Sequence, residues 1–174
     1  MTILESFYPD QWKESTYSLP FEKLYEEGYR GIIFDIDNTL VPHGADADER
    51  SIQLFKRLKE IGFKTVLLSN NKEPRVKRFN EKIGTRYIYK AGKPKKANYI
   101  KAMDLMETKK SNTLFVGDQI FTDVWGAKRI GIYSILVQPI NPKEEIQIVL
   151  KRYLERIVLY FYQKNKKERK SYGN

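Results

Sequence analysis

The stretch GIIFDIDNTLVP, residues 31–42, decides how this sequence folds and where its chemistry lies. It opens with an unbroken apolar run, which is typical of a parallel strand that is buried on both faces. Asp35 and Asp37 follow, two positions apart, where that strand is expected to end. Buried carboxylates are costly unless they are paired, neutralised or bound to a metal ion. The stretch therefore predicts a polar site at the end of a buried strand.

Strand and helix patterns alternate along the chain after this stretch. Apolar runs of strand length are separated by segments with the spacing of amphipathic helices, the first of which ends at Gly62. Pro94 suits the first position of the third helix. The alternation predicts an α/β fold, a Rossmann-like three-layer sandwich with a mainly parallel five-stranded sheet. We expect strands over 31–36, 63–70, 85–89, 112–117 and 133–138, and helices over 48–62, 73–84, 94–107 and around 121–131.

The chain divides into three parts by composition. At 174 residues it has the length of one ordinary domain. We expect an N-terminal edge segment over residues 1–27, the α/β domain over 28–140, and an amphipathic, basic C-terminal helix and tail over 141–174. Within the first part, LPFEKLYEEG (19–28) predicts a short helix packed on the domain edge.

The composition limits the possible classes of protein. The absence of cysteine excludes disulfides, thiolate metal sites and cysteine nucleophiles. No apolar run approaches the roughly 20 residues of a membrane-spanning helix, and the first residues lack the pattern of a signal peptide, so we expect a cytoplasmic protein. The net charge of +10 favours an anionic partner, which is a phosphorylated substrate, nucleic acid or an anionic lipid surface.

Polar side chains occur where the predicted strands end. The carboxyl ends of parallel strands meet at one edge of a sheet, where such folds bind their ligands. Three carboxylates, a hydroxyl and an ammonium group are thus expected to converge. They belong to Asp35, Asp118 and Asp123, to Ser69, and to Lys93 in AGKPKK.

These residues resemble, in the right order, the four motifs of the haloacid dehalogenase (HAD) superfamily of phosphohydrolases. The motifs are DIDNT (35–39), the strand-ending Ser69, the lysine of GKP (92–94) and GDQIFTD (117–123). Together with the length of the chain, the stretch 31–42 is most similar to the small YqeG-type branch, subclass IIIA, which is related to phosphatidylglycerophosphate phosphatases. The intervals between the motifs leave no room for a cap domain, so an open site is expected.

The resemblance implies a role for each matching residue. Asp35 would be the nucleophile that forms an aspartyl-phosphate, and Asp37 the general acid and base. Mg²⁺ would be held by Asp35, the backbone carbonyl of Asp37 and Asp118. Ser69, Asn70 and Lys93 would bind the phosphate oxygens, while Thr39 and Asp123 would support the loop, the metal-bound waters or Lys93.

Each of these residue types also has an ordinary structural role. Without the other motifs, Asp35 and Asp37 are equally compatible with loop capping, and Ser69 with capping of the following helix. Lys93 lies in a run with Lys90, Lys95 and Lys96 that resembles a solvated surface. His43 is interpreted as a loop residue, and Trp125 as part of the core or the sheet edge.

The C-terminal region predicts a long amphipathic helix from Pro142 onward. Residues 143–174 carry nine Lys or Arg and four Glu. One interpretation is a helix packed on the sheet, with a solvated basic end; the other is an anchor on an anionic membrane face. The sequence does not favour nucleic-acid binding through the basic end, because it contains no recognisable module for it. The predicted helix has an apolar stripe of residues at three- and four-residue spacing, and charged residues lie off this stripe. The apolar positions are Ile146, Val149, Leu150, Tyr153, Leu154, Ile157, Val158 and Phe161, and the charged ones are Lys151, Arg152, Glu155 and Arg156.

The motifs together predict a Mg²⁺-dependent phosphomonoester hydrolase. The resemblance further suggests phosphatidylglycerophosphate as the substrate, hydrolysed by a cytoplasmic protein bound peripherally at the inner membrane face. The alternative is a non-catalytic or regulatory module that binds a phosphorylated partner or RNA through the pocket and the basic tail.

Overall fold

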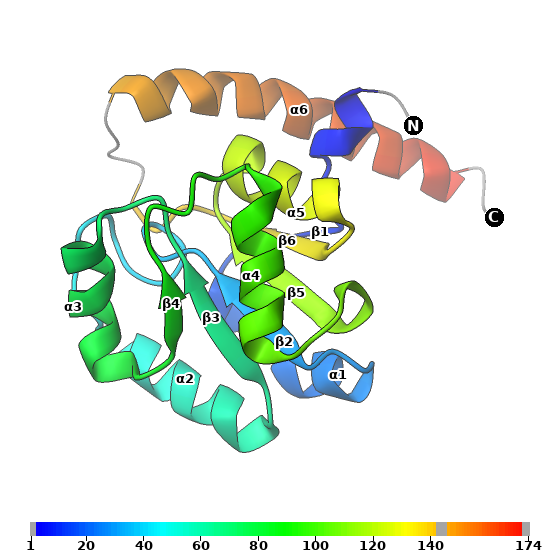
Figure 1. Cartoon of the computed structure of the whole chain (residues 1–174). Coiled ribbons are helices and arrows are strands. Elements are labelled where there is room, and N and C mark those ends of the chain that lie inside the picture. The colour runs from blue at the N-terminus through cyan, green and yellow to red at the C-terminus, as the bar shows by residue number, and fades with distance from the viewer. Residues whose placement is uncertain (1–2, 142–145, 172–174) are drawn as a thin grey trace.

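Six parallel strands form one sheet in the computed structural model, which describes residues 3–141 and 146–171 (Figure 1). The strand order is β1-β6-β5-β2-β3-β4, so β2 lies at the centre between β5 and β3. Phe34, the last residue of β2, is level with Val116 of β5 and Leu67 of β3. The strands are β1 (Gln11–Lys13), β2 (Gly31–Phe34), β3 (Lys64–Leu68), β4 (Arg86–Ile88), β5 (Thr113–Gly117) and β6 (Tyr133–Val137).

The sheet confirms the predicted α/β class and corrects the strand count from five to six. The additional strand, β1, pairs with β6 at the sheet edge, where Gln11 is level with Ile135 and Lys13 with Val137. Its three residues lie in a segment of mixed aromatic and charged residues, so pairing with β6 rather than an apolar pattern makes it a strand. The expected short helix of this segment is also present, as α1 (Phe21–Glu26).

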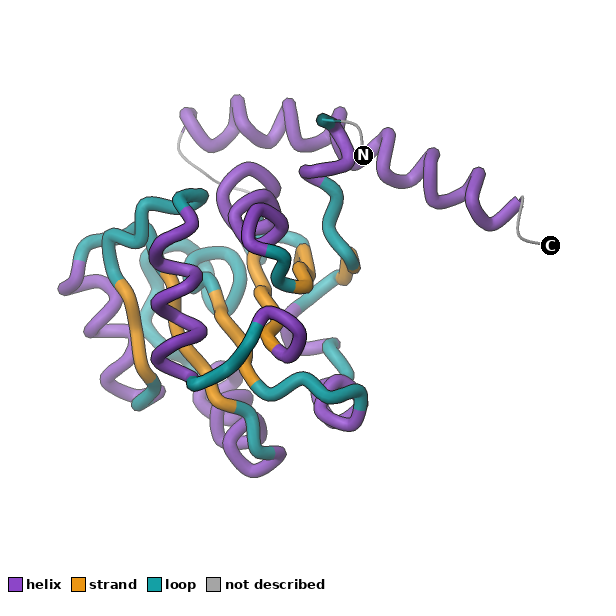
Figure 2. Tube along the Cα trace, turned by 45° about the vertical axis from the view of Figure 1, so that its right-hand side comes forward, coloured by secondary structure: helices purple, strands orange, loops and turns teal. Residues whose placement is uncertain are grey.

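Helices cover both faces of the sheet, as expected for a three-layer sandwich (Figures 1 and 2). Helices α1, α2 and α3 pack on one face, against Ile32 and Phe34 of β2. Helices α4 and α5 pack on the other face, against Ile33 of the same strand. The further helices are α2 (Glu49–Ile61), α3 (Glu73–Ile83), α4 (Lys96–Met106), α5 (Trp125–Ile130) and α6 (Ile146–Ser171), with 3-10 turns at Leu4–Phe7, Thr16–Ser18 and Lys110–Asn112 and a π-helical turn, η4 (Ile120–Val124).

Local signals explain where helix α2 begins and ends. The Asp48 side chain accepts a hydrogen bond from Ser51 N (2.8 Å) at the start of α2. Gly62 ends that helix with φ 110°, in the left-handed region that favours glycine. One expectation is wrong: α4 begins at Lys96, so Pro94 precedes the helix instead of occupying its first position. The residues before Lys96 form a loop whose backbone is held at Lys93 N by Asn70 Oδ1 (2.8 Å).

Helix α6 lies across the end of the sheet, beside the N-terminal 3-10 turn and η4 (Figure 1). Val158 is buried there among Ile120, Val124 and Leu136. Pro142, where the helix was expected to begin, lies outside the described residues. No helix within the described ranges is both long and apolar enough to cross a membrane.

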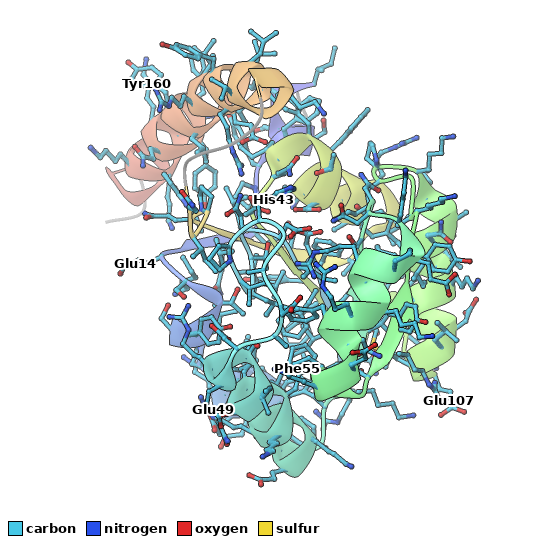
Figure 3. All side chains as sticks on the ribbon, turned by 90° about the vertical axis from the view of Figure 1, so that its left-hand side faces the viewer. Glu14, His43, Glu49, Phe55, Glu107 and Tyr160 are labelled. Carbon is cyan, nitrogen blue, oxygen red and sulfur yellow. The ribbon has the colours of Figure 1, made fainter. Side chains whose placement is uncertain are left out.

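The apolar stripe of α6 faces largely outward, unlike in the interpretation that packs it on the sheet. Val149, Leu150, Tyr153, Leu154, Ile157, Tyr160 and Phe161 are exposed, and Figure 3 shows Tyr160 on the outer side of the helix. Two polar residues that were expected off the apolar stripe, Arg152 and Glu155, face the domain instead. The interior of the domain therefore receives charged groups from α6, while much of its apolar surface meets solvent.

Candidate active site

Three buried carboxylates meet beyond the carboxyl ends of the two central strands. Asp35 follows β2, and its N–H donates to Val116 O of β5 (3.0 Å). Asp118 follows β5, and Asp123 lies in the π-helical turn η4. Oxygen atoms of the three side chains lie within 4.8 Å of one another. The predicted convergence of Asp35, Asp118 and Asp123 is therefore present in the structure.

Lys93 lies inside this carboxylate cluster, on the loop between β4 and α4. Its Nζ donates to Asp35 Oδ1 (2.5 Å) and to Asp123 Oδ1 (2.7 Å). Only 3% of the Lys93 side chain is exposed, so this ammonium group belongs to the interior and not to a solvated lysine run. The Asn70 side chain holds the Lys93 backbone in place.

Burial is the largest single influence on the pKa of Asp35, Asp118 and Lys93. It raises the pKa of Asp35 to about 7, although the neighbouring Lys93 charge acts in the opposite direction. Burial also raises the pKa of Asp118 well above its usual range, against the charge of Arg152. For Lys93, burial acts to lower the pKa, but the charges of Asp123 and Asp35 outweigh it and the pKa is raised. The ammonium group is therefore the firmly charged member of the cluster.

Thr39 and Gly117 allow the three carboxylates to lie close together. Thr39 Oγ1 donates to Asp118 Oδ1 (3.1 Å) and lies 3.5 Å from Asp35 Oδ2, so this buried hydroxyl bridges the ends of two strands. At Gly117 a Cβ atom would collide with the Asp123 side chain. A residue without a side chain is thus required there for Asp123 to reach the cluster.

The Asp37 carboxylate lies beside the cluster, on the β3 side. Its Oδ1 accepts hydrogen bonds from Arg75 Nη2 (2.9 Å) and Gly44 N (2.8 Å), and its Oδ2 accepts one from the Asn71 side chain. Ser69 is near: its Oγ accepts from Asn71 N (3.2 Å) and Asn71 Nδ2 (3.1 Å). Asp37 and Ser69 are therefore joined through Asn71.

Arg75 is a part of this arrangement that the sequence analysis missed. Its side chain is 12% exposed, and Nε and Nη1 are buried without a hydrogen-bond partner. In the sequence Arg75 is one of several basic residues of a surface helix, and no motif distinguishes it. His43, in contrast, is an exposed loop residue as expected (Figure 3), and Trp125 is half-buried against Phe7.

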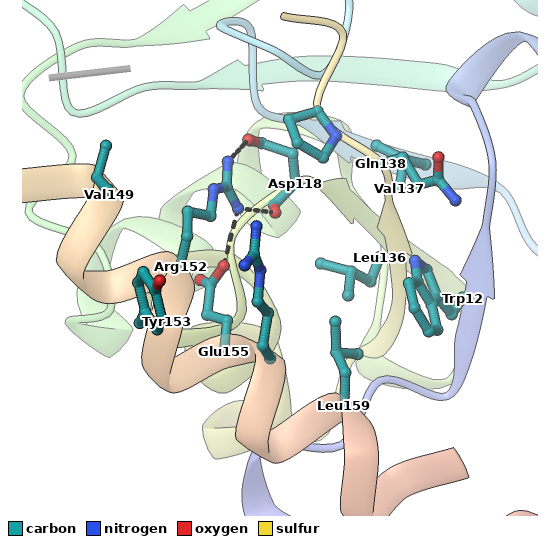
Figure 4. Close-up of a pocket in the computed structure, with 12 residues that line it drawn as sticks. Trp12, Asp118, Leu136, Val137, Gln138, Val149, Arg152, Tyr153, Glu155 and Leu159 are labelled. Atoms are coloured by element: carbon teal, nitrogen blue, oxygen red, sulfur yellow. Dashed lines mark hydrogen bonds and ion pairs between the residues drawn. The ribbon is translucent and has the colours of Figure 1, made fainter. Parts of the chain in front are cut away.

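Arg152 and Glu155 of α6 complete the polar network and were also missed. Arg152 Nη2 pairs with Asp118 Oδ2, while Nη1 donates to Asp118 O (2.6 Å) and to Glu155 Oε2 (2.9 Å) (Figure 4). Glu155 Oε1 accepts from Ile120 N of η4 (2.7 Å). The charge pattern of the helix alone gave no signal for this contact.

A cavity of about 240 Å³ opens beside this contact, between α6 and the edge of the sheet (Figure 4). Its polar lining residues are Asp118, Gln138, Arg152, Glu155 and Arg156. The remainder is largely apolar, with Trp12, Leu136, Val137, Val149 and Leu159 among the lining residues.

The carboxylate cluster has the composition of a site for a hard divalent cation. It offers carboxylate oxygens, which are the donors that Mg²⁺ and similar ions prefer. When all are ionised, three carboxylates face the two cations Lys93 and Arg152, so negative charge is in excess. The residues present therefore fit a bound divalent cation.

Comparisons with known proteins agree with this geometry. The sequence profile of the haloacid dehalogenase-like hydrolases matches residues 45–131. The Bacillus subtilis (strain 168) protein named "Probable phosphatase YqeG" is 40% identical over 154 residues, which are 88% of this chain and 90% of that protein. This chain belongs to the haloacid dehalogenase-like hydrolases. The predicted family is thereby confirmed, and the two matches support the predicted phosphatase.

Solved structures share the fold of this HAD-like hydrolase at low sequence identity. The cobalt-bound deoxy-D-mannose-octulosonate 8-phosphate phosphatase of Haemophilus influenzae is 14% identical, with a TM-score of 0.50 over 67% of this chain and 81% of that one. A Legionella pneumophila protein described as a HAD superfamily (subfamily III A) hydrolase is 15% identical, with a TM-score of 0.52 over 69% and 71%. These likenesses support the Rossmann-like fold.

Proposed function

We propose that this HAD-like hydrolase is a Mg²⁺-dependent phosphomonoesterase in which Asp35 accepts the phosphoryl group. One observation carries the proposal: Asp35, at the end of the central strand, contacts the Lys93 ammonium group at 2.5 Å and shares its surroundings with two more carboxylates. The relative named as a phosphatase and the phosphatase with the same fold support it.

The cation would be held by carboxylates of the cluster. Asp35 and Asp118, with the backbone carbonyl of Asp37, form the set that the family resemblance implies, and Asp123 offers a further oxygen near them. We propose Mg²⁺ because the donors are oxygen atoms. When bound, the cation offsets the repulsion between the carboxylates and an anionic phosphate.

The protein's own groups account for the remaining chemistry. The Asp35 carboxylate attacks phosphorus while the ester P–O bond breaks, and Asp37 gives the leaving alkoxide a proton. Asp37 then takes a proton from the water that releases phosphate from Asp35. Lys93 and Ser69 stabilise the negative charge on the phosphate oxygens. Asn70 holds the Lys93 loop, and Thr39 bridges Asp35 and Asp118.

The substrate we propose is a phospholipid phosphomonoester, phosphatidylglycerophosphate, at an anionic membrane face. No cap domain lies between the motifs: the chain from β3 to β4 contains α3 alone. The exposed apolar side chains of α6 stand beside exposed basic residues such as Lys151 and Arg156, a combination suited to an anionic bilayer. The apolar cavity next to Asp118 is suited to a substrate with an apolar part.

The catalytic proposal is tested by phosphate release from p-nitrophenyl phosphate with Mg²⁺ and with EDTA. We expect Asp35→Asn to lower kcat by about 10³-fold or more, because the nucleophile is removed, while circular dichroism shows a folded protein. Asp104→Asn, an exposed carboxylate on α4, is the matched control and should retain activity. Near-wild-type turnover by Asp35→Asn would refute the mechanism, and phosphate binding without turnover by the wild type would favour a regulatory module.

The substrate proposal requires a separate experiment. Phosphatidylglycerophosphate in vesicles is compared with soluble sugar, nucleotide and protein phosphates, and binding is followed by co-sedimentation with phosphatidylglycerol or phosphatidylcholine vesicles. We expect preferential binding to the anionic vesicles and preferential hydrolysis of the lipid. If the protein ignores anionic vesicles and hydrolyses a soluble phosphate faster, the lipid proposal is wrong.

A further inference from the structure

We propose that Arg152 and the divalent cation compete for Asp118, so that cation binding releases the first turns of α6 from the active site. This inference rests on the proposed cation-dependent function and adds a regulatory link to it. Asp118 belongs both to the carboxylate cluster and to the ion pair with α6. Asp118 therefore links the carboxylate cluster to helix α6.

Both oxygens of the Asp118 carboxylate already have a partner in the structure. Thr39 Oγ1 donates to Oδ1, and Arg152 Nη2 pairs with Oδ2. The Asp118 side chain is fully buried, and there like charges repel each other more strongly than in water. A cation that binds an Asp118 oxygen is thus opposed by a guanidinium group on the same carboxylate, and each weakens the binding of the other.

Among the described side chains of residues 149–154, Arg152 provides the polar contacts with the active site. From Val149 to Leu154, Arg152 is the only described side chain that is not exposed. The helix is held more firmly further on, where Glu155 accepts from Ile120 N and Val158 is buried. Loss of the Arg152–Asp118 pair should therefore free the turns before Glu155 and leave the rest of the helix docked.

Thermodynamic linkage makes this competition measurable from both sides. If the cation weakens the contact of Arg152 by some factor, removal of Arg152 must strengthen cation binding by the same factor. Hydrolysis is not needed as a readout. The affinity for Mg²⁺ and the exchange of α6 amides each report on one side of the linkage.

The first experiment measures Mg²⁺ binding to the metal-free full chain by calorimetry. We expect Arg152→Gln to lower the Kd for Mg²⁺ by about tenfold, a coupling of ordinary size, and Arg152→Lys to have a smaller effect. Lys151→Gln is the matched control: it removes one positive charge at the neighbouring, exposed position and should leave the Kd within about twofold, since an exposed charge is screened. An unchanged or higher Kd in Arg152→Gln overturns the inference.

The second experiment needs no variant and follows hydrogen exchange of the wild type with and without Mg²⁺. We expect faster exchange of the amides of residues 149–154 when Mg²⁺ is present, and no such change in Arg152→Gln. Equal or slower exchange with Mg²⁺ overturns the inference but leaves the phosphatase proposal intact. If Mg²⁺ binds neither the wild type nor Arg152→Gln, both the metal site and the inference are wrong.

Discussion

The carboxylate cluster at the strand ends (the strand-end cluster) and helix α6 differ in the kind of side chain that they bury and expose. In the cluster, charged groups are in the interior, and each of Asp35, Asp118 and Asp123 has a cationic partner. On α6, large apolar groups are at the surface; Leu150, for example, is 69% exposed. Interior charges persist here because they are paired, whereas the outer face of α6 contributes little to the fold and is available for another role.

Replacement of the buried Lys93, which pairs with Asp35 and Asp123, should have the largest effect on stability. Lys93→Met leaves Asp35 and Asp123 buried without their ammonium partner, so we expect the free energy of unfolding to fall by about 3–5 kcal/mol. Urea denaturation at pH 7 measures the change. Lys96→Met removes an exposed lysine nearby and should change stability by no more than about 0.5 kcal/mol. Equal effects of the two substitutions would contradict the importance of the buried pairs.

The free energy of unfolding should depend on pH because the pKa of the buried Asp35 is raised. The folded-state pKa of Asp35 is about 7, whereas an unfolded carboxyl group titrates near 3.9, so the folded protein binds the extra proton between these values. The contribution of this group is complete below about pH 4 and is lost as the pH rises toward 7, by at most about 1.4 kcal/mol per pH unit. Asp35→Asn has no carboxyl group at this position, so this loss of stability with rising pH should be absent.

Urea denaturation in EDTA at pH 5, 6 and 7 measures this effect. We expect Asp35→Asn to gain about 1–3 kcal/mol relative to the wild type between pH 5 and pH 7. Titrating groups distant from the cluster are the same in both proteins and cancel in the difference. Parallel pH profiles for the two proteins would show that the Asp35 pKa is not raised in the folded state.

The cluster could be anticipated from the sequence because topology determines it. In a parallel sheet every strand delivers its carboxyl end to one edge, so the order of the motifs was sufficient to bring Asp35, Lys93, Asp118 and Asp123 together. The side-chain direction of Asp37 was not accessible in this way. It depends on donors of the loop and helix after β3, Asn71 and Arg75, that belong to no motif.

Contacts of the chain ends were harder to anticipate for a different reason. The strand β1 is only three residues long, and its partner β6 lies more than a hundred residues away in the sequence. The apolar spacing of α6 left open whether its apolar stripe packs on the sheet or meets a membrane. Arg152 and Glu155 face inward because Asp118 and Ile120 N are available to them. The period of the apolar residues identifies a helix, whereas the polar groups of the domain beside it determine which face of the helix contacts the domain.

A buried side chain of α6 tests how firmly the helix is docked. Val158 is 5% exposed and packs among Ile120, Val124 and Leu136. Val158→Ala removes two methyl groups from this contact, so we expect docking of the helix to weaken by about 1.5 kcal/mol. Hydrogen exchange of the amides of residues 155–162 measures the change. Unaltered exchange would mean that this contact does not hold the helix.

The outer face of the same helix should show the smallest effect on stability. Leu154 is 52% exposed, so Leu154→Ser removes few intramolecular contacts, and we expect the free energy of unfolding to change by no more than about 0.5 kcal/mol. Binding to phosphatidylglycerol vesicles should nevertheless weaken measurably, because the affinity of an interfacial helix scales with its buried apolar area. Val158→Ala, in contrast, affects docking and spares the outer face. If Leu154→Ser destabilises the protein as much as Val158→Ala does, the apolar stripe of α6 packs inward, and the contrast between the two regions disappears.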